Sequence, residues 1–152
     1  MSSSNSSENS TKDTKIISVE GNIGSGKSTL VEELRKKFGN CDNICFLQEP
    51  VDIWNTIKDK DGNTMIAKFY ADTKKYSFAF QILAYITRLR KLLRALEQGE
   101  DKIIICERSI YTDKYVFAKM LYQQNFISNI EWKTYNYWFD TFKEKTKLNK
   151  II

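Results

Sequence analysis

The stretch EGNIGSGKST, residues 20–29, carries the clearest chemical signal in the sequence. It fits the phosphate-loop pattern G-x-x-x-x-G-K-[ST], with Gly21, Gly26, Lys27 and Ser28 at the fixed positions. In this pattern the backbone N–H groups surround phosphates, the lysine neutralises them and the hydroxyl ligates Mg²⁺. The loop therefore predicts a bound polyphosphate, but it does not say what receives a phosphate.

The residues around this loop support the same interpretation. An apolar, strand-like run precedes it and a helical pattern follows it, which is the context that the motif requires. An ordinary glycine turn before a helix is the alternative, and this context disfavours it. The residues predicted to bind the phosphates are Gly21, Asn22, Ile23, Gly24, Ser25, Gly26, Lys27, Ser28 and Thr29.

A carboxylate follows the next strand-like run, in the segment QEPV. Pro50 biases Glu49 toward an extended conformation, so the turn has a defined direction. A carboxylate there can take the proton from an attacking hydroxyl, as a general base does. The alternative is a solvent-exposed glutamate at a turn, and this spacing alone does not separate the two.

A third strand-like run ends in Glu107-Arg108-Ser109. Glu107 can hold Mg²⁺ directly or through water, as the acid at a strand end does in other phosphate-loop enzymes. Arg108 can stabilise the charge on a transferring phosphoryl group. The alternative for these two residues is a surface ion pair.

The elements that would position these residues alternate between strand and helix. Strands are predicted over 15–20, 44–48 and 102–106, and a fourth begins near 148; helices are predicted over 28–38, 64–96 with a break near Asp72, 109–124 and 128–145. In the first helix Leu30, Val31, Leu34 and Phe38 share one face. This alternation predicts an α/β fold like that of P-loop NTPases, a parallel sheet between two helical layers. Ligands of such sheets bind beyond the carboxyl ends of the strands. The phosphate loop, the QEPV segment and Glu107-Arg108-Ser109 all lie there.

Composition and length narrow the class of protein. The 152 residues suit one domain, and 41% hydrophobic residues indicate a globular body. The net charge of +5 is compatible with nucleic acid or a phosphate-rich ligand, but scattered lysines on solvated faces explain it as well. The chain has no histidine and its three cysteines form no CxxC pair, which disfavours zinc sites and histidine triads.

The beginning of the chain is predicted to lie outside the domain. Residues 1–14 are nearly all serine, threonine, asparagine or charged, so we expect a disordered leader before a domain spanning 15–152. The leader has no arginine and contains Glu8 and Asp13, unlike a mitochondrial transit peptide. No signal or transit peptide is evident, no apolar run approaches a membrane span, and unpaired thiols fit a reducing compartment. We therefore expect a cytoplasmic protein.

Taken together, GNIGSGKST, EPV followed by Trp54, SFAFQ and ERSIYTDKY resemble the deoxynucleoside kinase family, and the deoxycytidine and deoxyguanosine kinases in particular. The resemblance runs in order from Ile16 to the end of the chain. It implies ATP-dependent, Mg²⁺-assisted phosphorylation of the 5′-hydroxyl of a deoxynucleoside. It also implies that Glu49, Glu107 and Arg108 are catalytic. Either carboxylate can be the base, and we assign the hydroxyl proton to Glu49 and the metal to Glu107 with Ser28.

The resemblance also implies a nucleoside pocket. Tyr70 matches the tyrosine at the sugar 3′-hydroxyl, Trp54 and Phe80 the aromatic walls, and Gln81 the base-reading amide. The nucleoside-binding set is Glu49, Trp54, Tyr70, Phe80, Gln81, Ala84, Arg88, Arg108 and Asp113. Gln81, Ala84 and Arg88 recur on one helix face with Tyr85, which an amphipathic helix without a pocket also explains. Core packing is the alternative for Trp54 and Phe80.

Arg88 and Asp113 bear on substrate choice. Thymidine-preferring relatives of the family carry small or apolar residues at these two positions, whereas this chain has a charged pair. An ionised aspartate only accepts hydrogen bonds, so it favours an exocyclic amine over a carbonyl oxygen. The expected substrate is therefore deoxycytidine or a deoxypurine rather than thymidine.

The resemblance stops at Ile152, inside the predicted fourth strand. The family continues into an arginine-rich lid over ATP, so we expect an incomplete domain, its N-terminal two thirds. One alternative is a non-catalytic or degenerate member that binds nucleotide or acts in assembly, and another is a thymidylate-kinase-like nucleotide kinase. The aromatic-rich segment 109–145 could cover a homodimer face, as in the family, and neither nucleic acid nor a membrane is expected as a partner.

Overall fold

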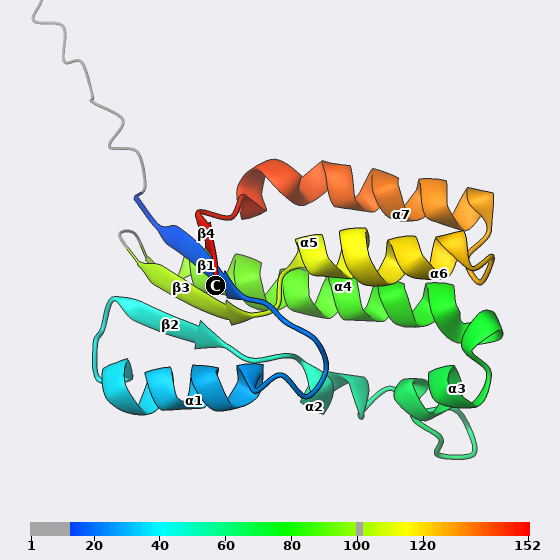
Figure 1. Ribbon diagram of the computed structural model, residues 1–152, viewed down its shortest axis with the longest axis horizontal. Helices are drawn as coiled ribbons and strands as arrows, with labels where there is room; N and C mark the ends of the chain where they lie inside the picture. Colours follow the sequence, from blue (N-terminus) through cyan, green and yellow to red (C-terminus); the bar gives the residue numbers. More distant parts are fainter. Residues whose placement is uncertain (1–12, 100–101) are drawn as a thin grey trace, which may run out of the picture.

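Four parallel strands form the centre of the protein, in the order β2-β3-β1-β4. The computed structural model describes residues 13–99 and 102–152, so nearly all of the predicted leader lies outside the described residues (Figure 1). The strands are β1 (Lys15–Val19), β2 (Ile44–Leu47), β3 (Ile103–Glu107) and β4 (Lys150–Ile151). The parallel sheet predicted from the alternation is confirmed, including the short fourth strand.

Both faces of this sheet are covered, because successive side chains of each strand point to opposite faces. On one face, Ile105 and Val19 pack with Val31 of α1 (Lys27–Phe38). On the other, Ile104 and Cys106 pack with Leu92 of α4 (Thr73–Glu97). Three layers result, which explains why β3 is apolar at successive positions. Leu30 was expected on the buried face of α1, but its side chain is 42% exposed.

The segment predicted as one long helix is divided where the sequence indicated. Helix α3 (Met65–Ala71) ends at Asp72, whose backbone is not helical (φ −145°, ψ 79°) and whose carboxylate accepts a hydrogen bond from Lys75 N at 3.2 Å. Asp72 therefore caps α4, because its oxygen satisfies one of the free N–H groups of the first turn. The sequence did not predict the short helix α2 (Val51–Trp54), which turns the chain after β2.

A second core lies among the helices beside the sheet (Figure 1). Tyr85 of α4 packs with Tyr135 and Phe139 of α7 (Asn129–Phe142), and all three side chains are at most 1% exposed. Helix α7 begins with a capping box between Ser128 and Glu131. A short 3-10 turn, η2 (Lys143–Thr146), then leads to β4.

The segment predicted as a single helix over 109–124 contains a wider turn. Helices α5 (Ile110–Thr112) and α6 (Lys119–Gln123) are joined by a π-helical segment, η1 (Asp113–Ala118). Such turns occur mostly as local insertions in α-helices, often at functional sites. Here Asp113 and Lys114 at its start are both buried, at 3% and 7% exposure. In the part of the chain that the structure describes, no helix is both long and apolar enough to cross a bilayer.

The central strand provides a test of the sheet core. Ile104 on β3 is fully buried, whereas Ile130 on α7 is 71% exposed. Replacing Ile104 by alanine leaves a cavity that its neighbours cannot fill, so we expect Ile104→Ala to lower the free energy of unfolding by about 2–5 kcal/mol in urea titrations. The matched change Ile130→Ala should stay within about 0.5 kcal/mol of the unchanged protein. Equal effects of the two changes would contradict the assignment of this core.

Candidate active site

The phosphate loop leaves β1 at the carboxyl edge of the sheet and enters α1 directly. Gly26, immediately before the helix, has φ +87°, a left-handed conformation that glycine adopts without strain. A Cβ on Gly21 would lie 2.6 Å from Ser25 Oγ, and Gly21 has φ +152°, so a larger residue does not fit. The loop backbone is therefore free to close around an anion at the start of a 12-residue helix.

The lysine of the motif lies over this loop. Lys27 Nζ donates to the backbone oxygen of Asn22 at 2.6 Å, and the residue is 8% exposed. The other predicted phosphate-binding residues, from Gly21 to Gly26 with Ser28 and Thr29, are exposed. The cation is thus held inside a loop whose outer surface is open to solvent, which is the arrangement that a phosphate group needs.

Glu107 connects the phosphate loop to the end of β2. The Ser28 hydroxyl donates a hydrogen bond to Glu107 Oε1, and Glu49 N donates to Glu107 Oε2 at 3.4 Å. Glu107 as a residue is 5% exposed. A hydroxyl and a carboxylate in contact are the hard oxygen ligands that Mg²⁺ accepts when phosphate and water supply the rest. These two side chains therefore fit a magnesium ion.

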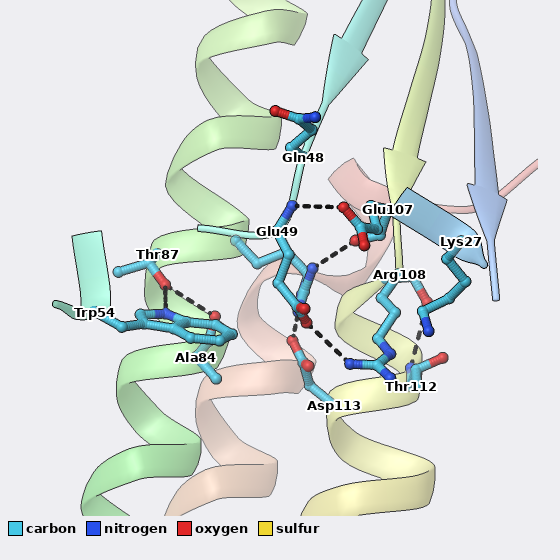
Figure 2. Close-up of polar contacts among 12 residues, drawn as sticks. Lys27, Gln48, Glu49, Trp54, Ala84, Thr87, Glu107, Arg108, Thr112 and Asp113 are labelled. Atoms are coloured by element: carbon cyan, nitrogen blue, oxygen red, sulfur yellow. Dashed lines mark hydrogen bonds and ion pairs between the residues drawn. The ribbon is translucent and has the colours of Figure 1, made fainter. Parts of the chain in front are cut away.

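Two guanidinium groups hold the carboxylate of Glu49, and Figure 2 shows the one from Arg108. Arg88 Nη2 lies 3.0 Å and Arg108 Nη1 3.1 Å from the same oxygen, Glu49 Oε1. Arg108 Nη2 also donates to Gly21 O at 3.4 Å, so this arginine joins Glu49 to the first glycine of the phosphate loop. The structure thus brings the residues after all three strands into one cluster.

Arg88 is at the centre of the buried part of this cluster. Its Nε donates to Asp113 Oδ2 at 2.8 Å and its Nη1 donates to Glu107 O at 2.8 Å. Burial lowers the pKa of Arg88, but pairing with Asp113 and Glu49 outweighs it and the pKa is raised overall, so the side chain stays charged. Burial raises the pKa of Asp113, against the opposing effect of Arg88.

The predicted aromatic wall is assembled next to α4. Trp54 and Phe80 meet edge to face, with ring centroids 5.4 Å apart. Trp54 Nε1 also donates to Thr87 Oγ1 at 2.9 Å, a buried contact of two elements far apart in the sequence. Phe80 stacks on Phe69, with ring centroids 4.7 Å apart. These contacts are compatible with a pocket wall and with core packing alike.

The remaining predicted pocket residues are placed differently. Gln81 is 4% exposed, and its Oε1 is buried without a hydrogen-bond partner in residues 13–99 and 102–152. A buried amide oxygen of this kind is available to a ligand. Ala84 is 5% exposed one turn further on. Tyr70 is 72% exposed, and its ring centroid lies 5.5 Å from that of Phe69. No described hydrogen bond joins Tyr70 to the carboxylate cluster.

Two residues at the site were missed in the sequence. Thr87 follows Ala84 on α4 and accepts the indole N–H of Trp54, but nothing in its spacing distinguished it. Glu20 lies directly after β1 and accepts hydrogen bonds from Ser18 and Ser109. Because it is a charged residue at a strand end, the same rule that selected Glu49 and Glu107 could have found it.

The buried pair of Arg88 and Asp113 gives a prediction with a defined pH dependence. Replacing Arg88 by methionine leaves Asp113 buried without its cation, so we expect the free energy of unfolding to fall by about 3–5 kcal/mol at neutral pH. Because burial raises the pKa of Asp113, the folded state binds a proton more readily than the unfolded state, and acid favours folding of this variant. The loss relative to the unchanged protein should therefore be smaller at about pH 5 than at about pH 8.

Urea titrations at both pH values measure this effect. Arg90→Met is the matched control, because Arg90 is an exposed arginine on the same helix, and it should change stability by less than about 0.5 kcal/mol. A loss in Arg88→Met that is identical at both pH values would show that Asp113 does not titrate in the folded variant.

Comparison with known proteins places these features in a family. Residues 17–152 match the family model described as deoxynucleoside kinase. The chain is 34% identical to deoxycytidine kinase 1 of Xenopus laevis, over 83% of this chain and 52% of that protein. It is 33% identical to the deoxycytidine kinase of Homo sapiens, over 91% and 60%. It is 30% identical to the mitochondrial deoxyguanosine kinase of Xenopus laevis, over 99% and 62%.

The chain thus spans little more than half the length of these curated relatives. Within that length, the matched region contains the whole sheet except the first two residues of β1, together with every element of the carboxylate and guanidinium cluster. The chain belongs to the deoxynucleoside kinase family.

Proposed function

We propose that the protein transfers the γ-phosphoryl group of ATP to the 5′-hydroxyl of a deoxynucleoside. The observation that carries this proposal is the Glu49 carboxylate, which Arg108 holds 3.1 Å away while also reaching Gly21 O of the phosphate loop. An acceptor for a proton and a cradle for phosphates therefore share one arginine. The names of the relatives, which are deoxycytidine and deoxyguanosine kinases, support the same activity.

On the phosphate side, the loop amides and Lys27 would hold the β- and γ-phosphates of ATP. Ser28 and Glu107 would hold Mg²⁺, which neutralises charge on the phosphates when it is bound. Arg108 lies between the loop and Glu49, so its guanidinium can stabilise charge on the phosphoryl group during transfer. Each of these roles is electrostatic, as phosphoryl transfer requires.

Glu49 is the proposed base. Glu107 contacts the hydroxyl of Ser28, the other proposed Mg²⁺ ligand, which supports placing Glu107 on the metal side of the site. Glu49 has both described contacts on Oε1, from Arg88 and Arg108. Its second oxygen is therefore the one that can take the hydroxyl proton of a nucleoside.

The nucleoside is proposed to bind against the face of α4 that carries Gln81, next to the aromatic side chains of Trp54 and Phe80. Gln81 supports this placement, because its Oε1 is buried and unpaired within the described residues. Ala84, one turn along α4, has a small side chain and is buried on the same helix face. The Tyr70 side chain on α3 is exposed, so its proposed contact with the sugar 3′-hydroxyl would require this side chain to become covered when substrate is bound.

The charge of Asp113 supports a preference for deoxycytidine or a deoxypurine. Asp113 is paired with the charged Arg88, which favours its ionised, acceptor-only form. Such a carboxylate accepts a hydrogen bond from an exocyclic amine and repels a carbonyl oxygen. Thymine presents a carbonyl where cytosine presents an amine.

The cellular location and the oligomeric state of the protein are also proposals. A cytoplasmic location is supported by Cys41, Cys45 and Cys106, all of which are free thiols. A homodimer is supported by apolar side chains on α7 that remain outside the core, since Ile130 is 71% and Tyr137 78% exposed.

The base assignment predicts a large loss of activity in Glu49→Gln. The amide keeps the size of the side chain but cannot take a proton, so we expect kcat for phosphoryl transfer to fall roughly 100-fold or more. Glu33→Gln is the matched control, because Glu33 is an exposed glutamate on α1 paired with Lys36. Transfer from labelled ATP to deoxycytidine in the presence of Mg²⁺ is the measurement. Full activity of Glu49→Gln would remove Glu49 from the mechanism.

The charge of Asp113 predicts the order of substrates. We expect kcat/KM for thymidine to be at least roughly tenfold below that of the best of deoxycytidine, deoxyadenosine and deoxyguanosine. Steady-state assays with the four deoxynucleosides measure this order. Thymidine monophosphate belongs in the same series, because phosphorylation of it alone would indicate a thymidylate-kinase-like enzyme. A thymidine value above the other three would contradict the proposed preference.

A further inference from the structure

Glu20 occupies a position that the proposed mechanism does not use. It is the residue between β1 and the phosphate loop, and one of its carboxylate oxygens accepts two hydrogen bonds. Ser18 Oγ donates to Glu20 Oε1 at 2.6 Å and Ser109 Oγ donates to it at 2.7 Å. A single oxygen therefore ties the end of β1 to the start of α5.

Arg108 directly precedes Ser109, and its backbone conformation is unusual. Arg108 has φ +62°, a left-handed backbone conformation that residues other than glycine, asparagine and aspartate rarely adopt. Arg108 N donates to Val19 O at 3.0 Å, and the next residue, Ser109, is held by Glu20. Hydrogen bonds on both sides therefore hold the strained residue, which persists only where its surroundings over-determine it.

Ser109 also starts the helix that follows. Its Oγ accepts a hydrogen bond from Thr112 N at 3.3 Å while it donates to Glu20. The hydroxyl thus uses both its donor and an acceptor site. Because Glu20 fixes the rotation of this hydroxyl, it fixes the point at which the turn after β3 becomes α5.

The backbone conformation decides where the Arg108 side chain goes. From the left-handed position the guanidinium reaches Glu49 Oε1 at 3.1 Å and Gly21 O at 3.4 Å, and it lies 5.0 Å over the ring of Phe117. A change of φ to the common negative values would reorient the Cα–Cβ bond and carry the guanidinium away from both oxygens. The turn at Ser109 and the active site are therefore mechanically linked.

We propose that Glu20 is a positioning residue for phosphoryl transfer, acting through Ser109 to hold Arg108 in the conformation that reaches Glu49 and the phosphate loop. This role rests on the proposed function, because Arg108 matters only if phosphate is transferred. Glu20 does not itself contact the reacting groups. Its other oxygen, Oε2, is buried without a hydrogen-bond partner in the described part of the chain, a cost that packing alone does not explain.

Kinetics of Glu20→Ala, Ser109→Ala and the double variant test the link. Both single changes break the hydrogen bond between Ser109 and Glu20. Glu20→Ala also loses the contact with Ser18, and Ser109→Ala the contact with Thr112 N. We expect kcat to fall roughly tenfold in each, with KM for ATP changed less than about twofold. The loss in the double variant should be clearly smaller than the product of the two single losses, because the shared bond between Ser109 and Glu20 is broken only once. Effects that multiply, or a rise in KM with kcat unchanged, would overturn the proposal.

Rescue separates positioning from general damage to the fold. In Glu20→Gln the amide oxygen can still accept from both serine hydroxyls, so this variant should recover most of the rate lost in Glu20→Ala. A variant Glu20→Gln as slow as Glu20→Ala would show that the hydrogen bonds are not what matters. Glu33→Ala, which loses only an exposed contact with Lys36, serves as the matched control and should keep the rate of the unchanged protein.

A structural readout makes the inference independent of activity. Crystal structures of Ser109→Ala and Glu20→Ala report the backbone of residue 108 directly. We expect φ of Arg108 to leave the left-handed region, or its contact with Glu49 to be lost. If Arg108 keeps both, the proposal is overturned. If the unchanged protein transfers no phosphate to any deoxynucleoside, the proposed function fails, and these structures alone decide whether Glu20 positions Arg108.

Discussion

The buried positive charge of Arg88 is the constraint around which the site is organised. A guanidinium removed from water is costly unless its N–H groups are paired, and here Asp113, Glu49 and the backbone of Glu107 share it. Those three partners come from the π-helical segment, the end of β2 and the end of β3. Pairing the one cation on α4 therefore fixes this helix relative to the end of β2 and to the segment that runs from the end of β3 into η1.

The parallel register of the sheet makes this arrangement possible. Val19 lies opposite Glu107 and Leu47 opposite Cys106, so the chain leaves all three strands at the same edge. The phosphate loop, Glu49 and Arg108 then meet without any long connection having to reach across the molecule. The link from Ser28 to Glu107 and the link from Arg108 to Gly21 close the cluster on the side of the phosphates.

The sequence predicted the elements better than the contacts. The strand-helix alternation, the break at Asp72 and the short strand near the end of the chain are local signals, and the structure agrees with them. The π-helical segment was missed because its residues have the spacing of an ordinary helix, and the ion pair between Asp113 at its start and Arg88 is a long-range contact. Leu30 was misplaced because helical spacing does not say how far the sheet extends over α1.

For this protein the sequence by itself determined the fold class, the phosphate loop and the types of residue at each strand end, because these depend on short-range patterns of glycine, charge and apolar spacing. It did not determine that two arginines share one oxygen of Glu49 or that Glu20 accepts a hydrogen bond from Ser109. Nor did it determine that the backbone of Arg108 is in the left-handed conformation. Those relations join residues separated by up to 89 positions. They depend on strand register and side-chain packing, which only the tertiary structure decides.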